Sequence, residues 1–242
     1  MKNFILFFVI TVIAKGVVAQ DSTEVRQYDF PFVLSFRYQP IHANAINDLL
    51  AANGYNRLPA SVWSIGAANS RYWNRFGLGG SLDALSTHGE PGSTRSARIV
   101  AFVVGPHVSY YVVQRADFVV YPIIGFRTAF IALQALDKTN ATSTNNILSQ
   151  DHRSATINYF NDLIDFGVGI SHRGTRRRRK FDCPQTDRYR LLDFKVGYNV
   201  SLSKRSYYGG ALLPGGANVQ INGFYVRVGY GFGTQITRMN WK

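Results

Sequence analysis

The sequence predicts an all-β protein that folds as a closed antiparallel transmembrane β-barrel of about eight strands, with ten as the alternative count. Apolar residues alternate with small or polar residues in eight separate segments, and this two-residue period is that of a β-strand with one apolar face. The chain is also rich in glycine and aromatic residues, with 22 Gly, 14 Tyr and 17 Phe. After the first twenty residues, no segment approaches the run of about 18 apolar residues that forms a membrane helix.

Most of the alternating segments are long enough to cross a bilayer at a tilt, which takes about 9–11 residues. A closed barrel of such strands leaves no unpaired edge in the lipid. In chain order the expected strands cover residues 32–38, 63–68, 76–84, 100–112, 118–130, 164–171, 192–202 and 222–234.

The polarity of the two strand faces distinguishes a membrane barrel from a water-soluble one. In the last segment Phe224, Val226 and Val228 share one face, whereas Arg227 and Gly229 share the other. The alternative, a secreted soluble sandwich or barrel, would cover its outer face with Lys, Glu, Thr and Gln. Small residues instead suit the narrow lumen of an eight-stranded barrel. We therefore expect the apolar faces to meet lipid, and Arg227 to meet an inward aspartate.

The connections between the strands set the expected topology. With both chain ends in the periplasm, the external connections are residues 39–61, 86–98, 132–162 and 204–221, and the periplasmic ones are 70–75, 113–117 and 173–189. Within the first external loop, residues 43–53 predict a short helix, because Ile46, Leu49 and Leu50 have i, i+3, i+4 spacing and Asn53-Gly54 is a C-terminal stop. We expect this helix to pack over a barrel mouth.

Residues 1–19 are expected to be a cleaved signal peptide, and residues 20–242 a single barrel domain. Lys2 precedes an apolar run from Phe4 to Ala14, and small residues lead up to a cleavage site before Gln20. The alternative is a membrane anchor, but the run is shorter than the roughly 20 residues that a spanning helix needs. Cys183 is the single cysteine, so no intrachain disulfide forms.

The strongly basic composition indicates partners that carry phosphate. The formal charge is +13, and it becomes +11 when the signal peptide takes Lys2 and Lys15 with it. Anionic lipid or lipopolysaccharide is the expected partner of such a surplus, and nucleic acid is not, because the protein is exported.

The inward face of the predicted barrel carries both signs of charge, which we expect to form an ion-pair network. A salt-bridged plug that closes the pore is one interpretation, because unpaired buried charges are costly. A polar ligand site or a narrow conduit is the other, and the pattern does not separate them. The expected lumen residues are Arg37, Asp83, His107, Arg127, Asp165, Asp193, Lys195 and Arg227.

Two further clusters have residue types that suit chemistry or binding. His107 and Ser109 share one inward face, and with Asp83 or Asp165 they would resemble the Ser-His-acid arrangement of a lipid hydrolase. A basic run, formed by Arg176, Arg177, Arg178, Arg179 and Lys180, is either a solvated loop or a contact for phosphate groups. The histidines lack metal-ligand spacing, so neither a metal nor a cofactor is expected.

The chain resembles the small bacterial outer-membrane β-barrel proteins, the porin-like superfamily of the eight-stranded type. The resemblance rests on the signal peptide ending in Ala19-Gln20, the alternating strands and the final GFYVRVGYGFG, and it covers most of residues 28–236. It concerns the fold and no residue-specific motif. It implies residence in the bacterial outer membrane and insertion by the barrel-assembly machinery.

Fold alone does not determine function in this family. The expectation is a non-enzymatic surface, structural or recognition barrel that contacts envelope or surface partners through long external loops. A narrow outer-membrane pore and a lipid-modifying hydrolase or acyltransferase are the alternatives.

Overall fold

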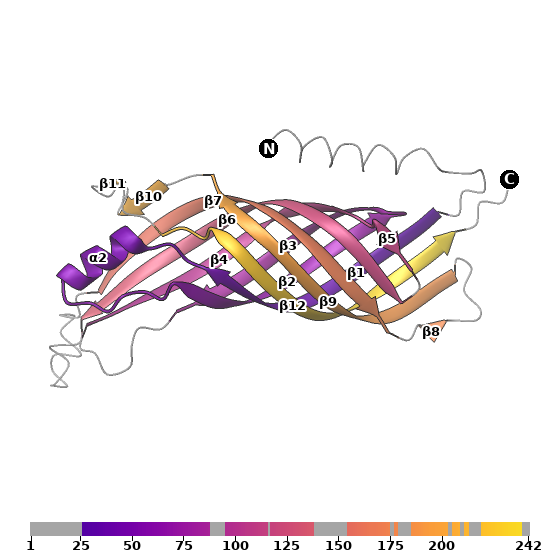
Figure 1. The fold of residues 1–242 in the computed structure, drawn as a ribbon, viewed down its shortest axis with the longest axis horizontal. Helices are drawn as coiled ribbons and strands as arrows, with labels where there is room; N and C mark the ends of the chain where they lie inside the picture. Colours follow the sequence, from indigo (N-terminus) through magenta and orange to yellow (C-terminus); the bar gives the residue numbers. More distant parts are fainter. Residues whose placement is uncertain are drawn as a thin grey trace.

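The protein is a closed eight-stranded antiparallel β-barrel (Figure 1). The computed structural model describes residues 26–87, 95–115, 117–137, 154–174, 177–178, 185–202, 205–208, 211–212 and 219–238. Neighbouring strands pair in chain order, and β1 pairs with β12 to close the cylinder. The eight barrel strands are β1 (Arg26–Pro40), β2 (Ser61–Trp73), β3 (Phe76–Ser86), β4 (Arg95–Tyr110), β6 (Phe118–Asp137), β7 (Ser154–Arg173), β9 (Gln185–Ser201) and β12 (Gly223–Arg238).

The predicted strand count and the predicted order of connections are confirmed. Four short strands extend the ends of the barrel and are not among the eight strands of its wall. They are β5 (Val113–Gln114), β8 (Arg177–Arg178), β10 (Arg205–Tyr208) and β11 (Ala211–Leu212). We call the end where β1 begins and β12 finishes the terminal end, and the opposite end the loop end. Residues 1–25 lie outside the described residues, and so does the expected signal peptide.

Several strands are longer than the alternation indicated. β1 starts at Arg26, β6 continues to Asp137 and β7 begins at Ser154, so the expected connection 132–162 is shorter. At these ends the outward positions, such as Gln134 and Asn158, are polar, so the contrast between the two faces fades although the pairing continues.

The outer surface of the barrel is apolar on every strand. Large exposed hydrophobic side chains occupy the outward positions, from Leu34 and Phe36 on β1 to Phe224 and Phe232 on β12. Phe224 is 80% exposed and Trp63 is 65% exposed. A water-facing surface rarely gathers so much contiguous apolar area. Among the described residues, no helix is long and apolar enough to span a membrane.

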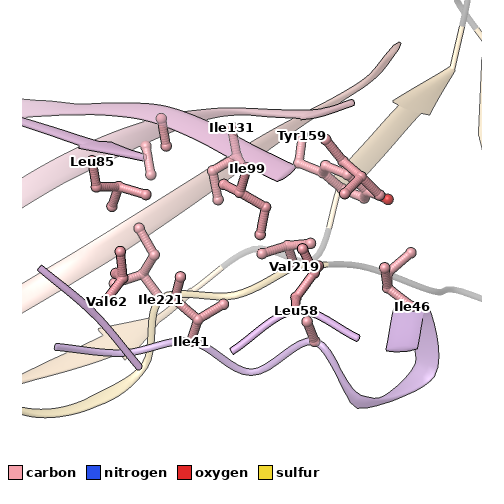
Figure 2. Packing of buried hydrophobic residues seen from close by; sticks show 14 of the residues in the cluster. Ile41, Ile46, Leu58, Val62, Leu85, Ile99, Ile131, Tyr159, Val219 and Ile221 are labelled. Carbon is pink, nitrogen blue, oxygen red and sulfur yellow. The ribbon is translucent and has the colours of Figure 1, made fainter. Parts of the chain in front are cut away.

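A helix and a strap, the name we give to residues 219–222 just before β12, close the loop end of the lumen with an apolar plug. The predicted helix is α2 (Asn44–Ala52), and it lies over the barrel mouth (Figure 1). Its buried Ile46 belongs to one apolar cluster with Ile41, Leu58 and the strap residues Val219 and Ile221 (Figure 2). These side chains meet the inward side chains of the barrel wall, which are Val62, Leu85, Ile99, Ile131, Tyr159 and Leu163.

Backbone and amide hydrogen bonds fix this plug in place. His42 and Gln220 exchange two backbone bonds, with N···O distances of 2.8 and 2.9 Å. The Asn47 side chain accepts a bond from the Leu58 amide (2.7 Å) and donates one to the Leu58 carbonyl oxygen (3.2 Å). Both bonds hold the chain that follows α2 against the helix.

Replacing Ile46 with alanine is expected to release α2 from the barrel mouth. Deleting a buried isoleucine side chain costs about 2–5 kcal/mol, and here that cost falls on the packing of α2. Faster amide hydrogen exchange in residues 44–52 would report the release. Leu49→Ala is the matched control, because Leu49 lies on the same helix but is 52% exposed. Equal acceleration in both variants would contradict the packing described.

Candidate functional site in the barrel lumen

All eight charged or histidine residues expected in the lumen lie buried inside the barrel. They come from the inward positions of seven different strands, and the strand pairing brings them into contact in groups. Acidic residues sit between basic ones, so ion pairs cross the lumen.

Five of these residues form a central cluster, defined as Arg37, Asp83, Arg127, Asp165 and Lys195. Asp83 accepts a hydrogen bond from Arg127 and lies 3.6 Å from Arg37 Nε. Asp165 lies 3.1 Å from Lys195 Nζ and 3.7 Å from Arg37 Nη2. Because each member comes from a different strand, the cluster ties β1, β3, β6, β7 and β9 together across the lumen.

Arg227 and Asp193 form a second group on the terminal side of the central cluster. Arg227 Nη2 lies 3.5 Å from Asp193 Oδ2, so Arg227 meets an inward aspartate as its strand position indicated. The hydroxyls of Tyr121 and Ser171 both donate to Asp193 Oδ1 at 2.5 Å. This carboxylate therefore has partners from β12, β6 and β7.

A third group near the terminal end was missed from the sequence. Asp29 accepts hydrogen bonds from Arg173 and Tyr189, and from the Tyr111 hydroxyl at 3.1 Å. The first strand was expected to begin at residue 32, and Arg173 was assigned to the loop with the basic run. The two-residue alternation would have identified Asp29 and Arg173 as inward residues. Asp29 continues the inward face of Arg37, and Arg173 continues that of Asp165.

Four lumen tyrosines lie directly across from glycines on the neighbouring strands. The paired positions are Tyr72 with Gly77, Tyr121 with Gly169, Tyr189 with Gly233 and Tyr225 with Gly197. A Cβ atom on each glycine would come within 2.4 Å of its tyrosine. The glycines therefore provide the space in which the rings lie.

The positions of the rings place tyrosine hydroxyls on the buried carboxylates. Tyr225 donates to Asp165 at 2.5 Å, Tyr121 reaches Asp193 and Tyr189 reaches Asp29. Asp83 itself lies across from a glycine, and its Oδ1 would be 1.8 Å from a Cβ on Gly66. Glycine on the inward faces is thus a condition for the ion pairs, a role that composition alone did not reveal.

The Ser-His-acid arrangement is not assembled. His107 Nε2 lies 2.9 Å from Ser70 Oγ, whereas Ser109 Oγ donates to the Tyr72 hydroxyl at 2.7 Å. Asp83 and Asp165 bind the cations of the central cluster. His107 and Ser109 are both buried inside the lumen, away from the lipid-facing surface where a lipid substrate would lie.

The described part of the basic run lies in the connection between β7 and β9, at the terminal end (Figure 1). Arg177 and Arg178 form β8, which pairs with Asp187 and Arg188 of β9. Arg176, Arg179 and Lys180 lie outside the described residues. Within the described part of the chain, no three His, Cys, Asp or Glu side chains come together as metal ligands.

Comparisons with known proteins add similarity of strand arrangement only. No family model and no curated protein matches this chain. Among solved structures, it is similar to Ail, the attachment invasion locus protein of Yersinia pestis, with a TM-score of 0.43 and 9% identity over 86% of this chain and 97% of that one.

The chain is also similar to OprG, an outer membrane protein from Pseudomonas aeruginosa, with a TM-score of 0.42 and 10% identity over 88% of this chain and 96% of that one. For Neisserial surface protein A the TM-score is 0.36 and the identity 11%, over 87% of this chain and 96% of that one. At such values these similarities carry no argument about function, and the barrel fold rests on the strand pairing itself.

Proposed function

We propose that this chain is an integral protein of the bacterial outer membrane, a non-enzymatic barrel with a closed lumen that acts through the loops of its external end. The proposal rests on the apolar outer face of the barrel. Trp63 and Trp73 face outward at the two ends of β2, and both are exposed. About ten residues at roughly 3.3 Å each, tilted by roughly 40°, span about 25 Å along the barrel axis, which is the height of a bilayer-facing apolar band.

The lengths of the connections support one orientation in the membrane. The connections at the terminal end are residues 74–75, 111–117 and 174–184, and those at the loop end are 41–60, 87–94, 138–153 and 202–222. Outer-membrane barrels have short periplasmic turns and long external loops. The loop end, with α2, is therefore the external end in this proposal, and insertion by the barrel-assembly machinery leaves both termini in the periplasm.

The closed lumen favours a structural or recognition role over conduction. Three ionic groups cross the lumen, and the apolar plug seals its loop end. A water-filled pore would need these contacts to open. The surface left for a binding role is the set of external loops above the plug.

Membrane fractionation and heat-modifiable migration test the proposal. We expect the protein in the outer-membrane fraction, with faster migration on a detergent gel before boiling than after it, because a closed barrel resists the detergent while folded. Recovery in the soluble fraction without detergent would contradict the proposal and favour the soluble alternative.

A conductance measurement on the same purified protein distinguishes the closed barrel from the narrow pore. A plugged barrel is expected to leave a planar lipid bilayer electrically silent. Stepwise conductance from the unmodified protein would support the pore instead.

The proposal includes a lipid partner at the terminal end, where exposed arginines lie at the edge of the apolar band. Arg71 on β2 and Arg188 and Arg190 on β9 occupy outward positions and are exposed. Residues 174–190 contain seven basic and two acidic residues, whereas the first external loop contains one of each, Asp48 and Arg57. In the proposed orientation, these arginines face the periplasmic leaflet, so phospholipid phosphates are their partners in preference to lipopolysaccharide.

Substituting Arg71, Arg188 and Arg190 by glutamine is expected to weaken binding to anionic phospholipid. The unmodified protein should unfold at a higher temperature in phosphatidylglycerol nanodiscs than in phosphatidylcholine nanodiscs, and the difference should shrink with salt and in the triple variant. Arg57→Gln, at the other end of the barrel, is the control. A triple variant that keeps the full difference would refute the lipid contact.

A further inference from the structure

A cavity of about 40 Å³ lies inside the terminal half of the lumen. Its charged and polar lining includes Ser70, His107, Arg173, Asp193, Lys195 and Arg227. The volume has room for about three waters, or for one small ion with a water beside it. It is too small for a sugar, a nucleotide or a lipid headgroup.

The ionic groups of the lumen do not balance. Among the described residues, the buried cations are Arg37, Arg127, Arg173, Lys195 and Arg227, and the buried carboxylates are Asp29, Asp83, Asp165 and Asp193. One positive charge therefore has no buried counter-charge. Asp187 lies at the terminal rim and is partly exposed, so solvent screens it.

The excess positive charge belongs to the central cluster, which has three cations and two carboxylates, and one of these cations, Lys195, also lines the cavity. Arg173 and Arg227 pair with Asp29 and Asp193. Three of the five cations line the cavity, namely Arg173, Lys195 and Arg227, but only one carboxylate does, Asp193. Asp193 already has Arg227 as an ion-pair partner and accepts two hydroxyl bonds. Cations therefore outnumber carboxylates in the cavity lining, in a region of low dielectric constant where charge interactions are strong.

Two arginines that line the cavity each have a buried nitrogen with no hydrogen-bond acceptor. Arg227 Nε and Arg173 Nη1 are both buried and unpartnered among the described residues. The two residues are 5% and 4% exposed, so bulk water does not reach these groups. Buried donors are nearly always satisfied in native proteins, which indicates that an acceptor occupies the cavity.

We propose that the cavity binds one small inorganic anion, of which chloride is the prototype, with Arg227 Nε and Arg173 Nη1 as its donors. The anion supplies the missing negative charge and satisfies both donors. Neutral hydroxyl groups, such as that of Ser70, can contribute further contacts. The bound anion then joins the ion pairs that hold β7 and β12 in place, so barrel stability depends on the anion present. This proposal is independent of where the barrel resides in the cell.

Bromide replaces chloride and can be located by its anomalous scattering, which gives a direct test. Crystals of the detergent-solubilised protein soaked in bromide should show an anomalous peak in the cavity, within hydrogen-bond reach of Arg227 and Arg173. A cavity that contains only water, with bromide confined to the outer surface, would overturn the proposal.

Unfolding in solution tests the same site through charge. At constant ionic strength, the unfolding temperature should be higher in chloride than in gluconate, which is too large for the cavity. Lys195→Met makes the buried charges equal in number, and Arg227→Met removes a donor, so both variants should lose this difference in unfolding temperature. Arg57→Gln changes an exposed side chain and should keep it. Equal unfolding temperatures in the two salts for the unmodified protein would also overturn the proposal. If Arg227→Met fails to fold, Lys195→Met and the crystals soaked in bromide still test the proposed anion site.

Discussion

Replacing Asp165 with asparagine is expected to lower the free energy of unfolding by about 3–5 kcal/mol, the usual cost of removing one partner from a buried ion pair. The substitution keeps the shape of the side chain but removes its charge. Lys195 then loses the carboxylate 3.1 Å from its ammonium group, and Arg37 loses one of its two acidic neighbours. Both cations stay buried without adequate compensation.

Denaturant unfolding of the barrel in detergent, followed by tryptophan fluorescence, measures this effect. Asp48→Asn is the control, because Asp48 also pairs with an arginine, at 3.6 Å from Arg57, but both side chains are more than two-thirds exposed. Exposed pairs contribute little, so we expect no measurable change in that variant. Equal midpoints for the two variants would show that the central cluster does not stabilise the barrel.

The double variant Asp165→Asn with Lys195→Met separates the loss of an ion pair from the loss of packing. Because it removes the ammonium group that the first change leaves unpaired, the double variant should be more stable than the sum of the two single effects indicates. Strict additivity would mean that the two residues do not interact across β7 and β9.

The lumen positions could be predicted from the sequence, because the alternation of inward and outward residues along a strand does not depend on which strands pair. Once Phe224, Val226 and Val228 are placed on the lipid side, Arg227 must point inward, and the same reasoning placed Asp165 and Lys195. The prediction weakened at strand ends, where lipid contact no longer requires apolar residues outside. Asp29 and Arg173 lie at such ends, so a complete ionic group was missed.

The partners of the lumen residues could not be predicted, because they depend on the stagger between strands. Tyr189 lies opposite Gly233 only in the register that β9 and β12 adopt, and the two residues are far apart in the chain. From the sequence, small inward residues were expected to suit the narrow lumen. Which side chain fills each space is a property of the closed barrel.

Replacing Gly233 with alanine is therefore expected to destabilise the barrel by about 1–3 kcal/mol, the range for overpacking a well-filled interior. The new Cβ would lie 2.2 Å from Tyr189 Cζ, so the ring must move. Movement of the ring withdraws its hydroxyl from Asp29, which also binds Arg173 and Tyr111. One added methyl group thus disturbs the whole ionic group at the terminal end. Denaturant midpoints of the unmodified and substituted proteins measure the loss.

Gly80→Ala provides the matched control, because Gly80 also lies in a strand but faces outward, and a Cβ there meets no atom closer than 3.8 Å. We expect that variant to be neutral or slightly stabilised, since alanine restricts the unfolded chain more than glycine does. Combining Gly233→Ala with Tyr189→Leu should cost less than the two changes added together, because the leucine leaves the added methyl group its space. If Gly233→Ala were as harmless as Gly80→Ala, the space opposite Tyr189 would not limit packing, and the glycines would not be required for the buried ion pairs.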